Sequence, residues 1–453
     1  MSHTLAQLRA GRLAGLARLD LAENLTEFPR EIFALADSLE VLNLSGNQLA
    51  ALPADLPRLH RLRVLFCSDN QFTELPAVLG QCAALEMVGF KANQIRTLPA
   101  AALPPRLRWL ILTDNQLEEL PPEIGSCRQL QKLMLAGNRL TSLPETMASL
   151  PRLELLRLAA NRLPALPGWL PDLPRLTWLA YAGNPFGAAA EAAARPHGPA
   201  RPVAWPELRL EAQLGEGASG VIHRAHWQPA GGAAPRAVAV KLFKGAVTSD
   251  GLPESEMAAC LRAGFHPNLI PVLGQISGHP TGTPGLVLEL IGPEFGNLAG
   301  PPSLESCTRD VYAPGTTFTL AAVLRLAHGV AAAAAHLHAQ GIMHGDLYAH
   351  NILNTAAGDA LLGDFGAASF FDPTDRKTAL ALQALEVRAF GVLLAELLGC
   401  LPAGEQGETG APADTVALLR QLQRQCQAPA AWQRPLFADL EPLLAALQPA
   451  LPA

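Results

Sequence analysis

Leucines recur at a regular spacing through the N-terminal part of the chain. The pattern LxxLxLxxN repeats there, as in LEVLNLSGNQLAALP (residues 39–53) and LQKLMLAGNRLTSLP (residues 130–144). Alternation within LxL predicts a short strand whose leucines all point to one face. One such unit cannot cover its own leucines, so stacked neighbours must share a continuous core. The pattern therefore predicts eight coils of a solenoid.

An asparagine marks each repeat at the point where the predicted strand turns. Its amide group both donates and accepts hydrogen bonds, so it can satisfy backbone groups of adjacent coils that would otherwise be buried unpaired. The pattern resembles the leucine-rich repeat family over residues 13–186, and we assign residues 1–186 to an α/β solenoid of this kind. Successive asparagines are 23 residues apart, except for one step of 22: Asn24, Asn47, Asn70, Asn93, Asn115, Asn138, Asn161 and Asn184.

The positions that alternate with the buried leucines should face the concave side of the solenoid. Several of them are large and apolar, which is unusual for solvent-facing residues. Two interpretations follow: the face binds a protein partner, or the rest of the chain covers it. The apolar residues of this face are Phe66, Trp109, Ile111, Met134, Leu155 and Trp178.

The repeat pattern ends after Asn184, and residues 187–205 have the small residues and prolines of a linker. Three predicted strands follow, in LRLEAQLGEGASGVIHRAHW and RAVAVKLF. The first turn contains Gly215, Gly217 and Gly220 in a GxGxxG arrangement. Dinucleotide-binding folds also use this motif but need a helix directly after it, whereas VIHRAHW is typical of a strand. The context favours a hairpin that covers phosphate groups.

Lys241 lies in the third predicted strand, within VAVK. Its neighbours are apolar, so the stem should be buried and the ammonium should need an anion. Glu256, on the next predicted helix, is our choice for that partner, and Glu254 is the competitor. Further strands are predicted in HPNLIPVLG and GLVLELIGPE, and a buried helix is predicted over residues 320–338.

The segment HGDLYAHN brings Asp346 and Asn351 onto one turn, and the later GDFG contains Asp364. These three oxygen-bearing side chains form a set that could serve phosphoryl transfer. Asp346 can orient a hydroxyl and accept its proton, while Asn351 and Asp364 can hold Mg²⁺. A carboxylate alone is most often a cap or turn residue, so the ordering of the whole set from Gly215 onward is what indicates function.

Residues 206–449 resemble a protein kinase domain, a two-lobed α+β fold. The resemblance rests on GxGxxG, VAVK, HPN, HxDxxxxN, DFG and the helix EVRAFGVLLAELL (386–398), with Glu386 where that helix usually begins with Asp. It implies catalytic roles for Lys241, Asp346, Asn351 and Asp364, with ATP and Mg²⁺ as cofactors. The implied nucleotide-binding residues are Gly215, Gly217, Gly220, Ile222, Ala239, Lys241, Glu256, Glu289, Ile291 and Leu353.

Several residues depart from the kinase pattern. Gly345 replaces an arginine that in regulated kinases binds a phosphorylated activation loop, so the resemblance implies that this switch is missing. Tyr348 stands where serine/threonine kinases have a lysine, and His350 where some tyrosine kinases have an arginine. Loss of such a cation costs roughly 10²- to 10³-fold in rate if nothing substitutes. The segment from Asp364 to Glu386 is short and lacks an APE triplet, which puts peptide docking in question.

Three functions fit these features. We rank an active protein kinase first, with the repeats recruiting its partner or substrate and the acceptor hydroxyl (Ser, Thr or Tyr) undetermined. A pseudokinase scaffold that binds nucleotide without turnover comes second. The HGD form also resembles small-molecule kinases such as the aminoglycoside and choline phosphotransferases, which we rank third.

Composition and charge indicate which partners and which cellular compartment to expect. The net charge of -6 provides no basic field for a nucleic acid. Seven cysteines without a CxxC pair indicate buried thiols in a reducing compartment. The N-terminal arginines interrupt any signal peptide, and we expect no membrane span. We therefore expect the cytoplasm, either of the cell that makes the protein or of one into which it is delivered.

Overall fold

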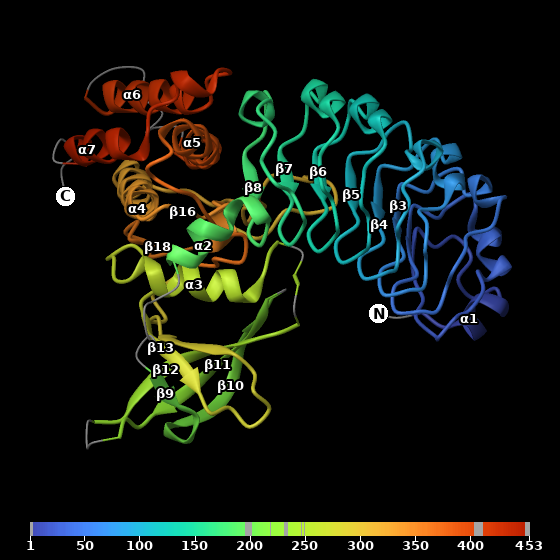
Figure 1. Ribbon diagram of the computed structural model, residues 1–453, viewed down its shortest axis with the longest axis horizontal. Coiled ribbons are helices and arrows are strands. Elements are labelled where there is room, and N and C mark those ends of the chain that lie inside the picture. The colour runs from blue at the N-terminus through green and yellow to red at the C-terminus, as the bar shows by residue number, and fades with distance from the viewer. Residues whose placement is uncertain are drawn as a thin grey trace. The chain divides into compact units, whose positions relative to one another are not determined.

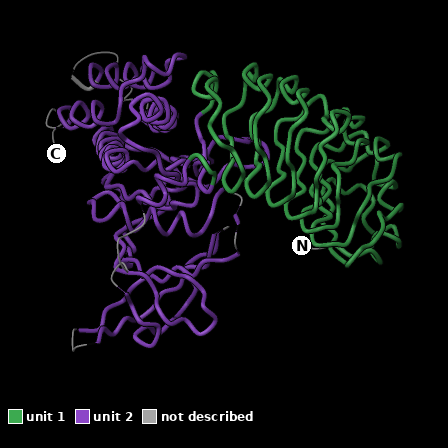
Figure 2. The backbone as a smooth tube through the Cα atoms, viewed as in Figure 1, with its two compact units in different colours: residues 1–176, 184–186 green, residues 177–183, 187–453 purple. Residues whose placement is uncertain are grey.

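The computed structural model describes residues 3–194, 202–217, 219–230, 234–245, 247–248, 250–402 and 411–448. These residues form two compact units, coloured separately in Figure 2. The first comprises residues 1–176 and 184–186. The second comprises residues 177–183 and 187–453. The short stretch 177–183 therefore belongs by its contacts to the second unit, although its sequence continues the leucine repeat.

The first unit is built from the predicted repeats. Each repeat contributes a three-residue strand, and consecutive strands pair in parallel one repeat apart, as in Val41 with Val64. The sheet keeps strict chain order, and β8 (Trp178–Ala180) is the next strand in that order. The strands of the first unit are β1 (Arg18–Asp20), β2 (Val41–Asn43), β3 (Val64–Phe66), β4 (Met87–Gly89), β5 (Trp109–Ile111), β6 (Lys132–Met134) and β7 (Leu155–Arg157).

Short 3₁₀ helices return the chain from one strand to the next, on the side of the sheet opposite its inner face (Figure 1). Prolines that follow the last leucine of a repeat stand at their N-caps, as Pro76 and Pro144 do. A proline fixes φ there and cannot extend the strand ladder, which explains the sharp exit from the sheet. These helices are η1 (Arg30–Leu35), η2 (Leu56–Arg58), η3 (Ala77–Gln81), η4 (Ala100–Ala102), η5 (Pro122–Ser126), η6 (Glu145–Ser149) and η7 (Leu170–Asp172), and the α-helix α1 (Leu5–Arg9) precedes β1.

The asparagines form the expected ladder. In Asn138, Nδ2 donates to Leu112 O at 2.9 Å and Leu135 O at 3.0 Å, and Oδ1 accepts from Leu117 N at 3.0 Å. The equivalent asparagines from Asn47 to Asn184 are buried. Asn24, by contrast, is exposed. It belongs to the first repeat, and no asparagine-bearing coil precedes it in the sequence. The ladder thus has seven buried members rather than the expected eight.

The concave face is less open than we expected. Phe66, Trp109 and Ile111 are half-buried, but Met134 and Leu155 are only 7% and 4% exposed. Within the first unit, Trp109 Nε1 donates to Met134 Sδ at 3.3 Å, so these side chains pack on one another. Of the two interpretations left open for this face, an exposed docking surface therefore does not include Met134 or Leu155.

In the second unit, a six-stranded sheet contains the three strands predicted around GxGxxG and VAVK. Its order is β10-β11-β12-β14-β13-β9. Helix α3 (Pro253–Ala263) follows β12 in the chain. Trp227, Val238, Val240 and Val287 are among the apolar side chains that fill the core of this sheet. The strands are β9 (Pro202–Ala204), β10 (Leu208–Glu216), β11 (Gly220–Trp227), β12 (Arg236–Phe243), β13 (Val272–Ser277) and β14 (Gly285–Glu289).

The rest of the second unit is mainly helical. Helix α4 (Leu320–Ala339) begins at Thr319, whose hydroxyl accepts from Ala322 N, and it packs against α7 (Phe437–Leu447). Helix α5 (Arg376–Gly399) packs against α6 (Ala411–Cys426). The remaining elements are η8 (Pro185–Gly187, in the first unit at its start), α2 (Ala188–Ala194), η9 (Trp205–Glu207), β15 (Gly296–Asn297), β16 (Ile342–Met343), η10 (Ala349–Asn351), β17 (Ile352–Asn354), β18 (Ala360–Leu362), β19 (Ser369–Phe370) and η11 (Ala431–Gln433).

Two expectations change here. Glu386 was placed at the start of a helix over 386–398, but α5 begins ten residues earlier, at Arg376, capped by Asp375. Residues 187–205, expected as a linker, contain α2 and β9, and β9 pairs in parallel with β13. Part of that expected linker, residues 195–201, lies outside the described residues.

By length and composition, α4 and α5 could each cross a membrane. In both, however, 67% of the hydrophobic window is buried inside the protein. Burial on this scale is typical of the core helix of a globular domain.

Candidate active site

The hairpin between β10 and β11 presents the three glycines differently. Gly217 N donates to Gly220 O at 2.9 Å, which closes the turn. A Cβ at Gly220 would lie 2.4 Å from Leu242 O on the neighbouring strand, so only glycine fits. A Cβ at Gly215 or Gly217 would meet nothing within 4 Å. The packing of the chain itself does not require glycine at these two positions, which fits a turn that a phosphate group approaches closely.

Lys241 and Glu256 are brought together from β12 and α3. Lys241 is 8% exposed and Glu256 is 2% exposed, and Lys241 Nζ pairs with Glu256 Oε1. Burial lowers the pKa of Lys241, but the charges of Glu256 and Asp364 outweigh it, so the pKa lies above its ordinary value. Glu254, the alternative partner, is exposed. The structure therefore holds a buried, charged ammonium close to the carboxylate of Asp364.

The loop between β16 and β17 contains Asp346 and Asn351. Asn351 Nδ2 donates to Asp346 O at 2.9 Å and to Asp346 Oδ2 at 3.0 Å. His344 is fully buried, and its Nε2 lies 2.8 Å from Gly363 O. A carbonyl can only accept, so Nε2 carries the proton and Nδ1 accepts from Asp346 N at 3.3 Å. These bonds fix the backbone on both sides of Asp346.

Asp364 joins the two parts of the site. Gly363 N, just before it, donates to Asn351 O at 3.0 Å. Asp364 has φ 51°, a left-handed conformation uncommon outside glycine, and its Oδ1 accepts from Gly366 N at 3.1 Å. Its charge raises the pKa of Lys241 on one side and of His350 on the other. Lys241, Asp346, Asn351 and Asp364 thus converge on one region of the second unit.

The remaining predicted nucleotide-binding residues lie on the strands around this region. Ile222 on β11 is the partner of Lys241 across the ladder, and Ala239 on β12 is the partner of Leu288. Leu353 lies on β17, two residues after Asn351. Glu289 N already donates to Pro271 O at 2.9 Å. A nucleotide there would therefore form its hydrogen bonds with the carbonyl of Glu289 and the backbone of Ile291.

The sequence analysis gave Glu386 no part in the site. In the structure, its carboxylate binds the backbone of the loop that carries Asp346. This fully buried carboxylate accepts from Gly345 N at 2.7 Å, from His344 N at 3.2 Å and from His338 Nε2 at 2.7 Å. Burial raises the pKa of Glu386, but the hydrogen bond and charge of His338 lead the opposing contributions, and the net pKa is lowered. The available signal was an acidic residue within the largely apolar sequence of α5.

Gly345 has a steric reason to be glycine. Its φ is +74°, and a Cβ there would lie 2.5 Å from Ala367 O and 2.8 Å from Leu179 O. An arginine cannot occupy this position without a shift of the backbone. The residue beside Leu179, Trp178, is 1% exposed and stacks on Tyr348. Trp178 is therefore not part of an open concave surface, because the loop that carries Asp346 covers it.

Comparison with known families agrees with both halves of the chain. Residues 208–392 match the model described as protein tyrosine and serine/threonine kinase. Residues 105–163, 128–186 and 38–59 match leucine-rich repeat models. This chain combines leucine-rich repeats with a protein kinase domain.

Curated relatives of this repeat-linked kinase domain are protein kinases. The chain is 29% identical over 191 residues to the L-type lectin-domain containing receptor kinase S.7 of Oryza sativa subsp. japonica. It is 32% identical over 175 residues to the DNA damage-responsive serine/threonine-protein kinase RqkA of Deinococcus radiodurans. These matches cover 38% and 37% of this chain, but only 26% and 23% of the relatives' own lengths.

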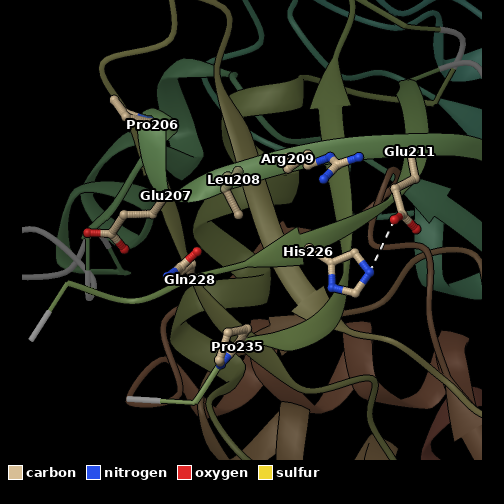
Figure 3. Close-up of a pocket in the computed structure, with 8 residues that line it drawn as sticks. All are labelled: Pro206, Glu207, Leu208, Arg209, Glu211, His226, Gln228 and Pro235. Atoms are coloured by element: carbon tan, nitrogen blue, oxygen red, sulfur yellow. Dashed lines mark ion pairs between the residues drawn. The ribbon is translucent and has the colours of Figure 1, made fainter. Parts of the chain in front are cut away.

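Two further features concern ligands. A surface hollow of about 350 Å³ lies beside β10 and β11, where His226 pairs with Glu211 (Figure 3). None of the predicted site residues lines it.

Among the described residues, no group of three or more His, Cys, Asp or Glu side chains could hold a metal ion by itself. Asn351 and Asp364 would be a pair of ligands that needs phosphate oxygens to complete the shell, as is usual for Mg²⁺.

Proposed function

We propose that this protein is an ATP-dependent protein kinase that transfers the γ-phosphoryl group of ATP to a hydroxyl group of a protein. The convergence of the Lys241–Glu256 pair with Asp346, Asn351 and Asp364 is the observation that carries the proposal. The match of residues 208–392 to a protein kinase model supports it. Phosphoryl transfer depends mainly on positioning and on charge stabilisation, and these residues could supply both.

Each residue has a separate task in this proposal. Lys241 binds the α- and β-phosphates, and Glu256 keeps its ammonium charged and in place. Asp346 orients the acceptor hydroxyl and takes its proton as the oxygen attacks the γ-phosphorus. Asn351, whose Nδ2 is engaged by Asp346, offers Oδ1 to Mg²⁺ together with the Asp364 carboxylate. Mg²⁺, when bound, neutralises charge that develops between the β- and γ-phosphates.

Serine or threonine is the acceptor that we favour. The Deinococcus relative is named as a serine/threonine-protein kinase, and this supports the choice. Mass spectrometry of the phosphorylated residue distinguishes these acceptors from tyrosine.

We further propose that the repeats recruit a protein partner or substrate through the half-buried concave residues Phe66, Trp109 and Ile111. Leucine-rich repeats are common interaction modules, and large apolar side chains favour docking.

We also propose a cytoplasmic location. All seven cysteines are free thiols, which suits a reducing compartment. Burial raises the pKa of Cys82 and Cys127 to about 11, so these two thiols have little reactive thiolate.

The decisive experiment is mass spectrometry of the full-length protein after incubation with labelled ATP and Mg²⁺. Asp346→Asn should abolish autophosphorylation, whereas Asp414→Asn, an exposed position on α6, should leave it unchanged. Nucleotide binding without any transfer would support the pseudokinase scaffold instead. Turnover that appears only with an added metabolite would support a small-molecule phosphotransferase.

A further inference from the structure

Trp178 contacts the two residues that follow Asp346. Its ring stacks on Tyr348, with the ring centres 4.0 Å apart and the planes 8° from parallel. Its Nε1 donates to Leu347 O at 3.2 Å. Trp178 and Tyr348 are 1% and 5% exposed, so the stack is shielded from water. A single side chain thereby restrains both the backbone and a ring directly after the proposed catalytic aspartate.

The backbone around Trp178 contacts the other end of the same loop. Leu179 O occupies the space beside Gly345 where a side chain would begin, at 2.8 Å from the position of a Cβ. Tyr181 N donates at 2.9 Å to Ser369 Oγ on β19, five residues after Asp364. Residues 178–181 therefore contact the loop before and after Asp346 and also the segment that follows Asp364.

The chain then continues to the helix that carries Glu256. Gly183 N donates to Glu191 Oε1 at 2.7 Å, which ties this segment to α2. At the end of α2, Ala193 O accepts from Arg262 Nη1 of α3 at 3.3 Å. The stretch from residue 177 to 194 thus reaches both the Asp346 loop and α3, the two parts that must be aligned for transfer.

We propose that Trp178 is a positioning residue for the Asp346 loop, and that residues 177–194 are a built-in element that holds this loop and α3 in their active arrangement. The inference rests on the proposed kinase function. Position 345 offers no side chain to bind a phosphate group, and the backbone of β8 fills the space beside it. We infer that the Asp346 loop reaches this arrangement without a phosphate group bound at position 345.

The first test compares full-length wild-type protein with Trp178→Leu, Trp178→Phe and the control Trp432→Leu. Trp432 is 84% exposed, so Trp432→Leu shows the effect of removing a tryptophan that is not buried against the Asp346 loop. Trp178→Leu should lower kcat at least tenfold and change KM for ATP less than twofold. Trp178→Phe, which keeps a ring for stacking, should stay within threefold of wild type. A kcat of Trp178→Leu within twofold of wild type would overturn the proposal, as would equal losses in the Leu and Phe variants.

A second measurement does not depend on turnover. Hydrogen exchange at Gly345, Tyr348 and Asn351, whose amides are bonded within the loop or to Glu386, should be at least tenfold faster in Trp178→Leu than in Trp432→Leu. Equal exchange would refute the positioning role. Trp178→Met, which retains much of the volume, replaces Trp178→Leu if that variant does not fold. If the wild-type protein transfers no phosphoryl group, the proposed kinase function is wrong. The hydrogen-exchange comparison still shows whether Trp178 positions the Asp346 loop.

The last arm tests independence from phosphorylation. Wild-type protein pretreated with phosphatase should keep its initial rate within twofold and show no lag. A lag that disappears after preincubation with ATP would show that a phosphorylated residue is needed, and that part of the proposal would be wrong.

Discussion

Lys241 forms its ion pair with Glu256 while both side chains are almost fully buried. Breaking a buried pair by removing one charge leaves the other uncompensated, which is far more costly than losing a surface pair. The pair therefore fixes the Lys241 ammonium in place, at the point where the proposed phosphate contact would form.

Glu256→Gln should impair nucleotide use. Burial lowers the pKa of Lys241, and the negative charges of Glu256 and Asp364 raise it. Glu256 has the larger effect of the two, and the variant loses it, so the charged ammonium is less stable. We expect kcat/KM for ATP to fall at least about tenfold, equivalent to about 1.4 kcal/mol. Steady-state kinetics and direct measurement of the Kd for ATP check this. The exposed Glu254→Gln serves as control, and equal behaviour of the two variants would contradict the assignment.

Gly345→Arg, which introduces the arginine usual in regulated kinases, should damage this protein. The left-handed φ and the close carbonyl oxygens of Ala367 and Leu179 leave no room for a Cβ. We expect a loss of unfolding free energy on the order of 3 kcal/mol, together with loss of transfer. Gly345→Ala should show most of the same loss. Thermal unfolding provides the measurement, and Gly399→Ala, where a Cβ would meet nothing within 4 Å, is the matched control.

Much of the fold could be predicted from local patterns because its information is local. The asparagine ladder follows from a short period, and three of the predicted strands near Gly220 and Lys241 follow from alternation and turn residues. The ordering of Asp346, Asn351 and Asp364 reflects spacing along a short segment. All these features depend on neighbours in the sequence, so their residue types alone reveal them.

The features that the sequence did not reveal depend on distant partners. Trp178 and Trp109 occupy the same repeat position, yet Trp178 stacks on a residue 170 positions later while Trp109 bonds to Met134 in a nearby repeat. Nothing in the repeat pattern distinguishes them. Glu386 likewise lies inside a helix, where its role depends on His338 and the backbone of Gly345. Such roles become visible only when the elements are packed.

Glu396 should make stability depend on pH. Burial raises its pKa to about 7, with the charge of Asp310 acting in the same direction, and Arg309 and His350 opposing. An unfolded glutamic acid has a pKa of about 4.3, so the folded state binds more protons between about pH 4.3 and 7. The unfolding free energy should therefore fall as pH rises through this window, by at most about 4 kcal/mol.

Glu396→Gln should remove this dependence, because the neutral amide can still accept a hydrogen bond from Tyr312, as Glu396 Oε2 does at 3.3 Å. Urea unfolding at pH 5, 6, 7 and 8 provides the comparison. The variant should match wild type at pH 5 and exceed it at pH 8. The exposed Glu294→Gln should keep the wild-type profile, and a wild-type profile in Glu396→Gln would contradict the assigned pKa.

Asn138→Ala should destabilise the solenoid. The substitution leaves Leu117 N, Leu112 O and Leu135 O without the partner that the amide supplies. Each unsatisfied buried group costs about 1–3 kcal/mol, and partial relaxation reduces the sum, so we expect a loss of about 3 kcal/mol. Urea unfolding followed by circular dichroism measures it. Gln48→Ala, at an exposed position one residue after Asn47, should change stability by less than about 0.5 kcal/mol. A loss in Asn138→Ala no larger than in Gln48→Ala would show that the ladder bonds add nothing to stability, and stacking of the leucines alone would then hold the repeats together.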